Sequence, residues 1–405
     1  MNSEEQIVGY PTQNALKQLM QPDMLGGFAI AGYVFFLPFN THPDSATFVL
    51  VALGLLATYF RKGFRPQLER FDCIVILFVI AASSISTLLS GDPARSFRFL
   101  IYLCLNMFLL VLAASMVSRR MVQIMAGGLA LFGLFHLSAI LVTSQILGSV
   151  TADSLIKHLH IATLIVPNDA LILGLCLPSM FFLFLNNDVK SPLIPLIAAV
   201  LYVSFAVYVS YLFQSKLTLL SIVVALLAMT SAWMTFPRKE KSKVHNKMVM
   251  VSTIGLLLLL SASVWYLGNQ STTRLSLWSV ASTAHTTTSE VLFGAGPNTF
   301  LYNPAVIDSE FDKGDFVIPW VHNLYLEAYY DQGLFGLTGI LILTFIPLIR
   351  AMRIEDRAVR AMLMASMLTF CVLALFEVTL TRRFYFAFLA IMYGLCIAQS
   401  KEIHP

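Results

Sequence analysis

The sequence has few charged residues and few cysteines for its length. Asp, Glu, Lys and Arg make up only 12% of its 405 residues, whereas 58% are hydrophobic and the mean hydropathy is +0.77. This composition excludes a soluble domain, which could not keep so much apolar surface in water. The five cysteines lie in or beside apolar runs without the paired spacing of a metal or redox site, which favours small core residues over a disulfide framework.

The first residues also lack the features of a secretory signal peptide. Residues 1–23 carry Glu4 and Glu5 where a basic n-region would lie, and they contain no small-residue cleavage site, so we expect a retained cytoplasmic segment. Neither a P-loop nor a Rossmann glycine fingerprint occurs in the sequence. No nucleic-acid partner is expected.

About twelve apolar runs are present in place of a soluble core. A helix needs about 20 residues to cross the ~30 Å hydrocarbon layer, and no alternating barrel pattern is visible. The expected fold class is therefore an all-α polytopic membrane protein with about twelve transmembrane helices, surrounded by membrane lipids. The expected spans are residues 24–39, 45–60, 73–90, 97–117, 121–142, 169–185, 193–213, 217–236, 248–267, 333–349, 358–377 and 384–398.

Basic connections predict the orientation of these spans. The links rich in Lys and Arg all fall on one side if the spans alternate, and the positive-inside rule makes that side cytoplasmic. Both termini are then cytoplasmic, and the longest connection lies on the outer face. The expected organisation is a cytoplasmic segment (1–23), transmembrane helices 1–9 (24–267), an outer loop containing short helices (268–332), and helices 10–12 with a cytoplasmic tail (333–405).

Several cations lie on the outer side despite this orientation. Any one of them is explained by a side chain that anchors at the interface and snorkels into water. Lys216 is harder to explain, because it lies between two apolar runs with almost no aqueous loop, where ionisable groups usually face a cavity and a partner. Together such cations would bind an anion, and phosphate or pyrophosphate is the natural choice. The set comprises Arg95, Arg98, Lys157, Lys216, Arg274, Arg382 and Arg383.

Other features of the outer loop have simple structural interpretations. The turn at residues 293–298 reads F-G-A-G-P-N; a tight bend is the simpler interpretation, and a backbone nest around Gly296 that helps hold an anion is the alternative. His285 lies among Thr and Ser, which favours a solvated surface position. At about 100° per residue, Glu327 shares a helix face with Asn323 rather than with His322, and we expect it on a polar face.

One stretch, residues 320–336, leads from the outer loop into an apolar run. It reads W-V-H-N-L-Y-L-E-A-Y-Y-D-Q-G-L-F-G, with His322 and Asn323 near its start and Gly333 and Gly336 opening the apolar part. An isolated histidine more often has a structural role. Here, however, the imidazole lies at the mouth of a membrane helix, where a reaction on a lipid-linked substrate would need a base.

The spacing of these residues resembles that of a known enzyme family. His322-Asn323, nine further residues and then Gly333-Leu334-Phe335-Gly336 is similar to the H-[N/S/Q]-x9-G-x-x-[G/T/Y] pattern of bacterial O-antigen ligases, whose superfamily includes O-antigen polymerases and protein O-oligosaccharyltransferases. The similarity extends over nearly the whole chain, with the long loop before the motif and Arg274 shortly ahead of Trp278. Lys216 is a departure, because the family usually has Arg there and Lys lacks its planar fork.

The resemblance implies a glycosyltransfer on the periplasmic face of the bacterial inner membrane. The donor would be an undecaprenyl-pyrophosphate-linked O-polysaccharide, and the acceptor a sugar hydroxyl of the lipid A-core oligosaccharide. His322 would be the general base, since imidazoles titrate near neutral pH, and Arg274 and Lys216 would bind the pyrophosphate. Fixed cations would replace a metal, so an inverting transfer without metal or cofactor is expected. The candidate supporting residues are Asn323, Arg95, Arg98, Arg382, Arg383 and Gly296.

Other functions fit parts of the same pattern. A polymerase would share the donor, the base and the phosphate site but would use a second carrier-linked chain as its acceptor, and a protein O-oligosaccharyltransferase would use a protein. A polysaccharide transporter or flippase also has about twelve helices in many families. It is the minor alternative, because the halves of the sequence do not match and few ionisable residues lie deep in the spans.

Overall fold

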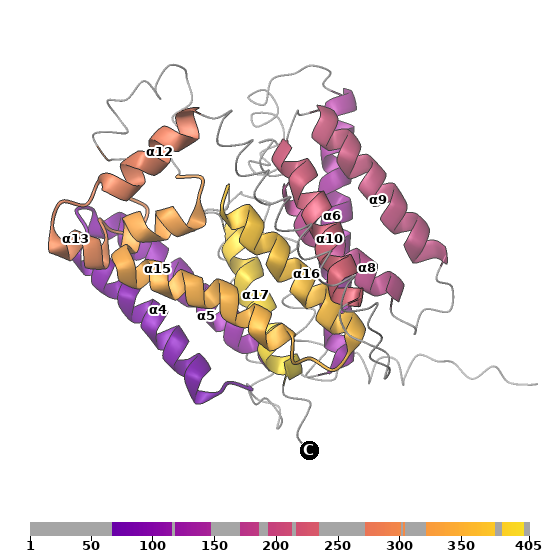
Figure 1. Ribbon diagram of the computed structural model, residues 1–405, viewed down its shortest axis with the longest axis horizontal. Helices are drawn as coiled ribbons and strands as arrows, with labels where there is room; N and C mark the ends of the chain where they lie inside the picture. Colours follow the sequence, from indigo (N-terminus) through magenta and orange to yellow (C-terminus); the bar gives the residue numbers. More distant parts are fainter. Residues whose placement is uncertain are drawn as a thin grey trace, which may run out of the picture.

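The computed structural model describes residues 67–115, 118–146, 171–185, 193–212, 216–234, 272–300, 303, 321–376 and 383–400. Within these ranges the regular structure is helical and no strand occurs (Figure 1). Five of the described helices are long and apolar enough to cross a membrane, so the chain has the all-helical, transmembrane character that its composition predicts. The number of about twelve spans stays a prediction, because the runs expected at residues 24–39, 45–60 and 248–267 lie outside the described residues.

The helices coincide with the apolar runs of the sequence. Each run expected within the described residues overlaps one helix, and α12 and α13 lie where a loop with short helices is expected. The candidates for membrane crossing are α4, α5, α6, α15 and α16. In chain order the described helices are α4 (Arg70–Leu89), α5 (Pro93–Ala113), α6 (Arg119–Ile146), α8 (Leu171–Leu185), α9 (Leu193–Leu212), α10 (Lys216–Met234), α12 (Thr272–Thr283), α13 (Thr288–Phe293), α15 (Leu324–Ala351), α16 (Arg357–Ala374) and α17 (Arg383–Ser400).

Short polar side chains begin several of these helices. Asp92 caps α5 by accepting a hydrogen bond from the Arg95 N–H, and Pro93 occupies the first turn, where its missing N–H is not needed. Asp356 caps α16 by accepting two backbone N–H bonds. These caps fix the points at which the chain turns from one helix into the next.

Helix α17 lies at the centre of the bundle and has no exposed face. Every side chain from Phe384 to Gln399 is buried, and the helix packs against α5, α15 and α16 (Figure 1). Gly394 allows a close approach to α5, because a Cβ at this position would overlap the backbone carbonyl oxygen of Leu110. A helix that is apolar on all sides is typical of the core of a large or membrane-embedded protein.

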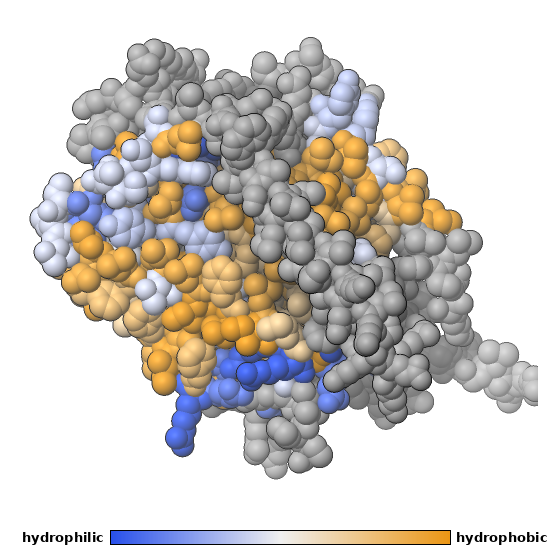
Figure 2. Space-filling model, viewed as in Figure 1, coloured by the Kyte–Doolittle hydropathy of each residue, from blue (hydrophilic) through white to orange (hydrophobic). Residues whose placement is uncertain are grey.

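Helix α4 shows the opposite pattern and presents large apolar side chains outward. Ile74, Leu77 and Leu88 are 63%, 65% and 80% exposed. Figure 2 shows an apolar zone across the face on which α4 and α15 lie, with polar residues bordering it on both sides. Contiguous apolar surface of this kind is costly in water, so hydrocarbon is the environment that suits this face.

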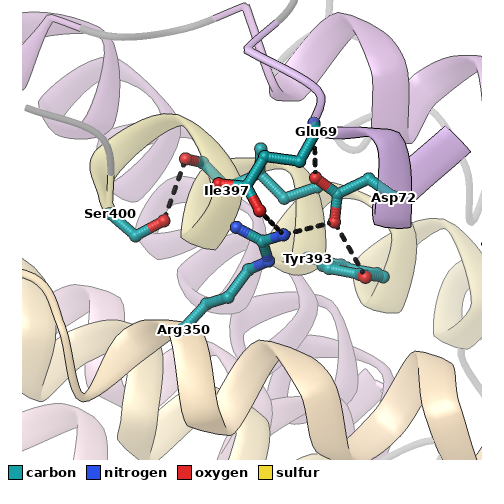
Figure 3. A network of polar contacts seen from close by, with 6 residues as sticks. All are labelled: Glu69, Asp72, Arg350, Tyr393, Ile397 and Ser400. Carbon is teal, nitrogen blue, oxygen red and sulfur yellow. Dashed lines mark hydrogen bonds and ion pairs between the residues drawn. The ribbon is translucent and has the colours of Figure 1, made fainter.

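A buried ion pair joins α4 to α15. Arg350 Nη2 lies 2.7 Å from Asp72 Oδ1 and 3.2 Å from Glu69 Oε2, and the Tyr393 hydroxyl of α17 donates to the same Asp72 oxygen at 3.3 Å (Figure 3). Asp72 is 1% exposed and Arg350 is 6% exposed. Because Asp72 lies in the first turn of α4 and Arg350 in the last turn of α15, the two helices run antiparallel.

Candidate functional site

Helix α15 is broken at Gly333. The backbone there has φ 64° and ψ −158°, which is not helical, and the helical run expected over residues 333–349 is the part that follows the break. Residues 324–332 form a further helical segment ahead of it. Gly333 and Gly294 lie back to back, since a Cβ on Gly333 would overlap the backbone of Leu292 and a Cβ on Gly294 would overlap that of Asp331. Only glycine combines this close approach with a positive φ at little cost.

The break leaves backbone carbonyls that α15 itself cannot satisfy. The last four carbonyls of a helical segment have no partner within it, and here donors from other elements supply bonds. Ser86 of α4 contributes its hydroxyl, and residues 285–296 contribute a ring N–H and two backbone N–H groups. The pairs are His285 Nε2 to Tyr329 O at 3.1 Å, Ala295 N to Tyr330 O at 2.9 Å, Gly296 N to Asp331 O at 3.0 Å and Ser86 Oγ to Asp331 O at 2.7 Å.

The glycine turn at residues 293–298 is closed by these and related bonds. The Gly294 N–H donates to the Glu290 carbonyl, and the Asn298 N–H donates to Asp331 Oδ2 at 2.9 Å. A Cβ on Gly296 would overlap the side chain of Ser90. The turn therefore already binds a carboxyl group of the protein itself. The tight bend describes it, and the Gly296 N–H has an internal acceptor in the Asp331 carbonyl. A role of Gly296 in helping to hold a substrate anion stays a prediction.

A capping box fixes the start of the short helix α13. The Thr287 hydroxyl accepts from the Glu290 N–H at 3.2 Å, and Glu290 Oε2 accepts from the backbone N–H groups of Thr286 and Thr287 at 2.9 and 3.0 Å. These backbone hydrogen bonds favour the charged carboxylate and lower the pKa of Glu290. The capping box fixes the start of α13, and α13 leads directly into the glycine turn that contacts the break in α15.

His322 has an unusual backbone conformation. Its φ is 54°, in the left-handed region that few residues other than glycine adopt. The residue is 8% exposed, directly after Val321, which is fully buried. Conformations of this kind cost about 1–3 kcal/mol and persist only where the surrounding structure imposes them. The sequence gives no sign of this strain, which becomes visible only in the fold.

Asn323 is the N-cap of α15. Its side-chain Oδ1 accepts the backbone N–H groups of Tyr325 and Leu326, each at 3.0 Å, and its Nδ2 donates to the Leu375 carbonyl at the end of α16 at 3.1 Å. These contacts join the first turn of α15 to the end of α16. Asn323 therefore orients the backbone beside His322, and its amide is occupied by the protein.

Helix α12 lies against the residue before His322. The Trp278 indole N–H donates to the Val321 carbonyl at 3.0 Å. Arg274 lies four residues earlier on α12, so it shares a face with Trp278. The structure therefore brings the element that carries Arg274 into contact with the His322 segment. A small core beneath α12 holds this arrangement, and its buried members are Leu277, Ala281, Phe300, Val321 and Tyr330.

Among the remaining predicted cations, the structure describes the side chains of Arg95 and Arg98 only. Lys216 and Arg383 are the first residues of α10 and α17, but their side chains and the whole of Arg382 lie outside the described residues. Arg95 forms an ion pair with Asp92 at 3.7 Å, and Arg98 is exposed on the same helix turn. The described contacts connect the start of α5 to the glycine turn, through a hydrogen bond of 3.0 Å from Ser96 Oγ to the Pro297 carbonyl.

Two polar residues behave differently from the sequence-based expectation. His285 is half-buried and stacks on Tyr330 with ring centroids 5.6 Å apart, whereas a solvated position was expected. Glu327 is 3% exposed and does not lie on a solvated polar face. The expectation for His285 fails because its ring packs against Tyr329 and Tyr330 of α15, a contact between residues far apart in the sequence.

The arrangement suits proton transfer beside a bound anion. His322, with its strained backbone, precedes a helix N-terminus whose dipole favours negative charge, and α12, which carries Arg274, contacts the residue before it. In the described part of the chain, no three His, Cys, Asp or Glu side chains are grouped so that they could hold a metal ion. Comparison of the sequence with protein-family models and with curated proteins finds no match to either.

Proposed function

We propose that this protein is an O-antigen ligase, which transfers O-polysaccharide from undecaprenyl pyrophosphate to the lipid A-core oligosaccharide. The observation that carries the proposal is the state of His322. It is a strained, largely buried histidine within the H-N-x9-G-x-x-G spacing, and the residue before it is bound by Trp278 of α12, the helix that carries Arg274. Strain of this cost is more often retained at a reacting group than in a passive core position. The proposal includes a site on the periplasmic face of the inner membrane and cytoplasmic termini.

The reaction would be a direct displacement at the anomeric carbon of the donor. The acceptor hydroxyl oxygen forms a bond to this carbon while its proton passes to the His322 imidazole. The bond from the anomeric carbon to the pyrophosphate oxygen breaks, and undecaprenyl pyrophosphate leaves with the electron pair. Attack opposite the leaving group inverts the anomeric configuration. General base catalysis typically contributes a factor of about 10²–10⁴ to such a step.

The negative charge that develops on the leaving group needs fixed positive partners. Arg274 is suited to this role, since it lies in the first turn of α12 on the face that reaches the His322 segment. Lys216, at the start of α10, is the second candidate. Preorganised cations of this kind stabilise charge as it forms without reorganising, and they supply what a metal ion would supply elsewhere.

The test is transfer by the purified protein in proteoliposomes. The donor is an undecaprenyl-pyrophosphate-linked oligosaccharide, the acceptor is lipid A-core, and the product is read as a gel shift of the acceptor. His322→Ala should lower turnover by about 100-fold or more. His404→Ala, which removes a histidine of the expected cytoplasmic tail, is the control and should leave turnover unchanged. Arg274→Ala should raise the KM for the donor, and Lys216→Arg should be tolerated better than Lys216→Ala.

Three outcomes would contradict the proposal. Full activity of His322→Ala would remove the base from the mechanism. Growth of the saccharide on the carrier with no shift of the acceptor would identify a polymerase instead. Loss of transfer in the presence of a chelator, restored by a divalent cation, would overturn the metal-independent chemistry.

A further inference from the structure

Trp278 contacts the peptide group that immediately precedes His322. Its indole N–H reaches the Val321 carbonyl at 3.0 Å, across a sequence separation of 43 residues. The Val321 side chain is fully buried, so its carbonyl depends on protein donors more than on water. Trp278 itself is half-buried and packs against the small core under α12. Trp278 therefore makes both an apolar packing contact and a hydrogen bond.

The backbone of His322 is held on both sides. On one side Trp278 fixes the Val321 peptide group. On the other side Asn323 is fixed by its bonds to the first turn of α15 and to the Leu375 carbonyl. A left-handed residue between two fixed neighbours has little freedom to relax, although its own conformation is unfavourable. Without one of the two holds, the strain could be released by rotating the backbone, and the imidazole would turn with it.

We propose that Trp278 is a positioning residue for His322. The indole N–H holds the Val321 peptide in the orientation that forces His322 into the left-handed conformation, and this sets the direction of the imidazole. Because Arg274 lies one helical turn earlier on α12, the same contact sets the spacing between the base and the cation. The inference rests on the proposed function for the role of His322, whereas the mechanical effect of the hydrogen bond can be tested without it.

Four proteins separate this role from simple packing. Trp278→Phe keeps an aromatic ring in the core but removes the donor, and Trp278→His restores a ring N–H at a similar reach from the backbone. Tyr330→Phe is the matched control, since it removes a different side-chain hydrogen bond in the same small core, the one that Asn303 Nδ2 donates to the Tyr330 hydroxyl at 3.2 Å. The wild-type chain completes the set.

Two measurements are made on each protein. The first is transfer kinetics: Trp278→Phe should lower kcat about tenfold or more, because small misplacements of a reacting group are costly, with the KM for the donor within about twofold of wild type. The second is hydrogen exchange of the Tyr325 and Leu326 amides, which the Asn323 cap protects. These amides should exchange about tenfold faster in Trp278→Phe, as expected for loss of one buried hydrogen bond. Trp278→His should restore both, and Tyr330→Phe should change neither.

The two measurements also distinguish failure of the positioning role of Trp278 from failure of the proposed function. Unchanged exchange of the Tyr325 and Leu326 amides in Trp278→Phe would overturn the positioning role, whatever the kinetics show. An equal fall of kcat in Trp278→Phe and Tyr330→Phe would do the same, since it would reduce Trp278 to packing. If His322→Ala keeps full transfer activity, the proposed function fails, while faster exchange in Trp278→Phe would still show that the indole holds the His322 backbone.

Discussion

At the scale of single residues, His322 has an energetically unfavourable backbone conformation. Its left-handed backbone is unfavourable by about 1–3 kcal/mol for a residue with a Cβ, and its neighbours Val321 and Asn323 hold it in place. A residue that tolerates a positive φ should therefore stabilise the fold at this position, although it would remove the proposed base.

The prediction concerns His322→Gly compared with His322→Ala. Both variants lack the imidazole and should be inactive, but Gly adopts the left-handed region freely and Ala does not. His322→Gly should therefore unfold at a higher temperature than His322→Ala, with a difference in unfolding free energy of about 1 kcal/mol. Thermal unfolding in detergent measures it. A lower unfolding temperature for the Gly variant would show that His322 is not strained.

Sequence reasoning finds some of these residues and misses others, and the reason is physical. His322, Asn323 and Arg274 stand out because their residue types and spacing carry chemistry along the chain itself. Trp278 and Asp331 do not, because each acts through a contact with a distant segment. The only local feature that marks Trp278 is its position one helical turn after Arg274. That position does not indicate which carbonyl the indole binds.

At the scale of elements, the break in α15 is what brings residues 272–300 to the site. Gly333 frees carbonyls at Tyr329, Tyr330 and Asp331, and the donors that satisfy them come from α4 and the α13 region. Hydropathy predicts the helix after the break but not the segment before it. That segment contains the buried polar residues Glu327, Asp331 and Gln332. Their polarity lowers the local mean hydropathy, so the segment is predicted to be a loop.

Gly333→Ala tests the break. A Cβ there would overlap the backbone of Leu292 and Phe293, and the positive φ adds strain, so the variant should lose about 2 kcal/mol or more of unfolding free energy. Gly127→Ala on α6 is the control, because a Cβ at that position meets no atom within 4 Å and alanine favours the helix. Equal unfolding temperatures for the two variants would contradict the interlocked geometry.

At the scale of the whole molecule, polar contacts tie α4 to α15 at both ends. The ion pair of Asp72 and Arg350 closes one end, and the hydrogen bond of 2.6 Å from Ser83 Oγ to Gln332 Oε1 lies at the other, beside the break. Composition predicts the helical bundle and its apolar face. It does not predict this pairing, because an acid at residue 72 and an arginine at residue 350 each look like ordinary charges at helix ends.

The ion pair should show the behaviour of buried charges. Asp72→Leu or Arg350→Met alone should cost about 3–5 kcal/mol, since each leaves a buried charged partner unpaired, whereas Asp72→Leu combined with Arg350→Met should cost much less. Unfolding free energies in detergent, combined in a double-mutant cycle, measure the coupling. Additive losses would mean that the two charges do not depend on each other in the folded protein.

The back-to-back glycines, Gly294 and Gly333, have a consequence for chimeric proteins. Each glycine makes room for the backbone of the other's segment, so neither segment carries a complete contact surface of its own. Grafting residues 272–300 from a relative onto this chain would succeed only if the relative's counterpart of residues 329–333 travelled with them. The smallest exchangeable unit is thus a discontinuous pair of segments, a limit that no inspection of either segment alone would reveal.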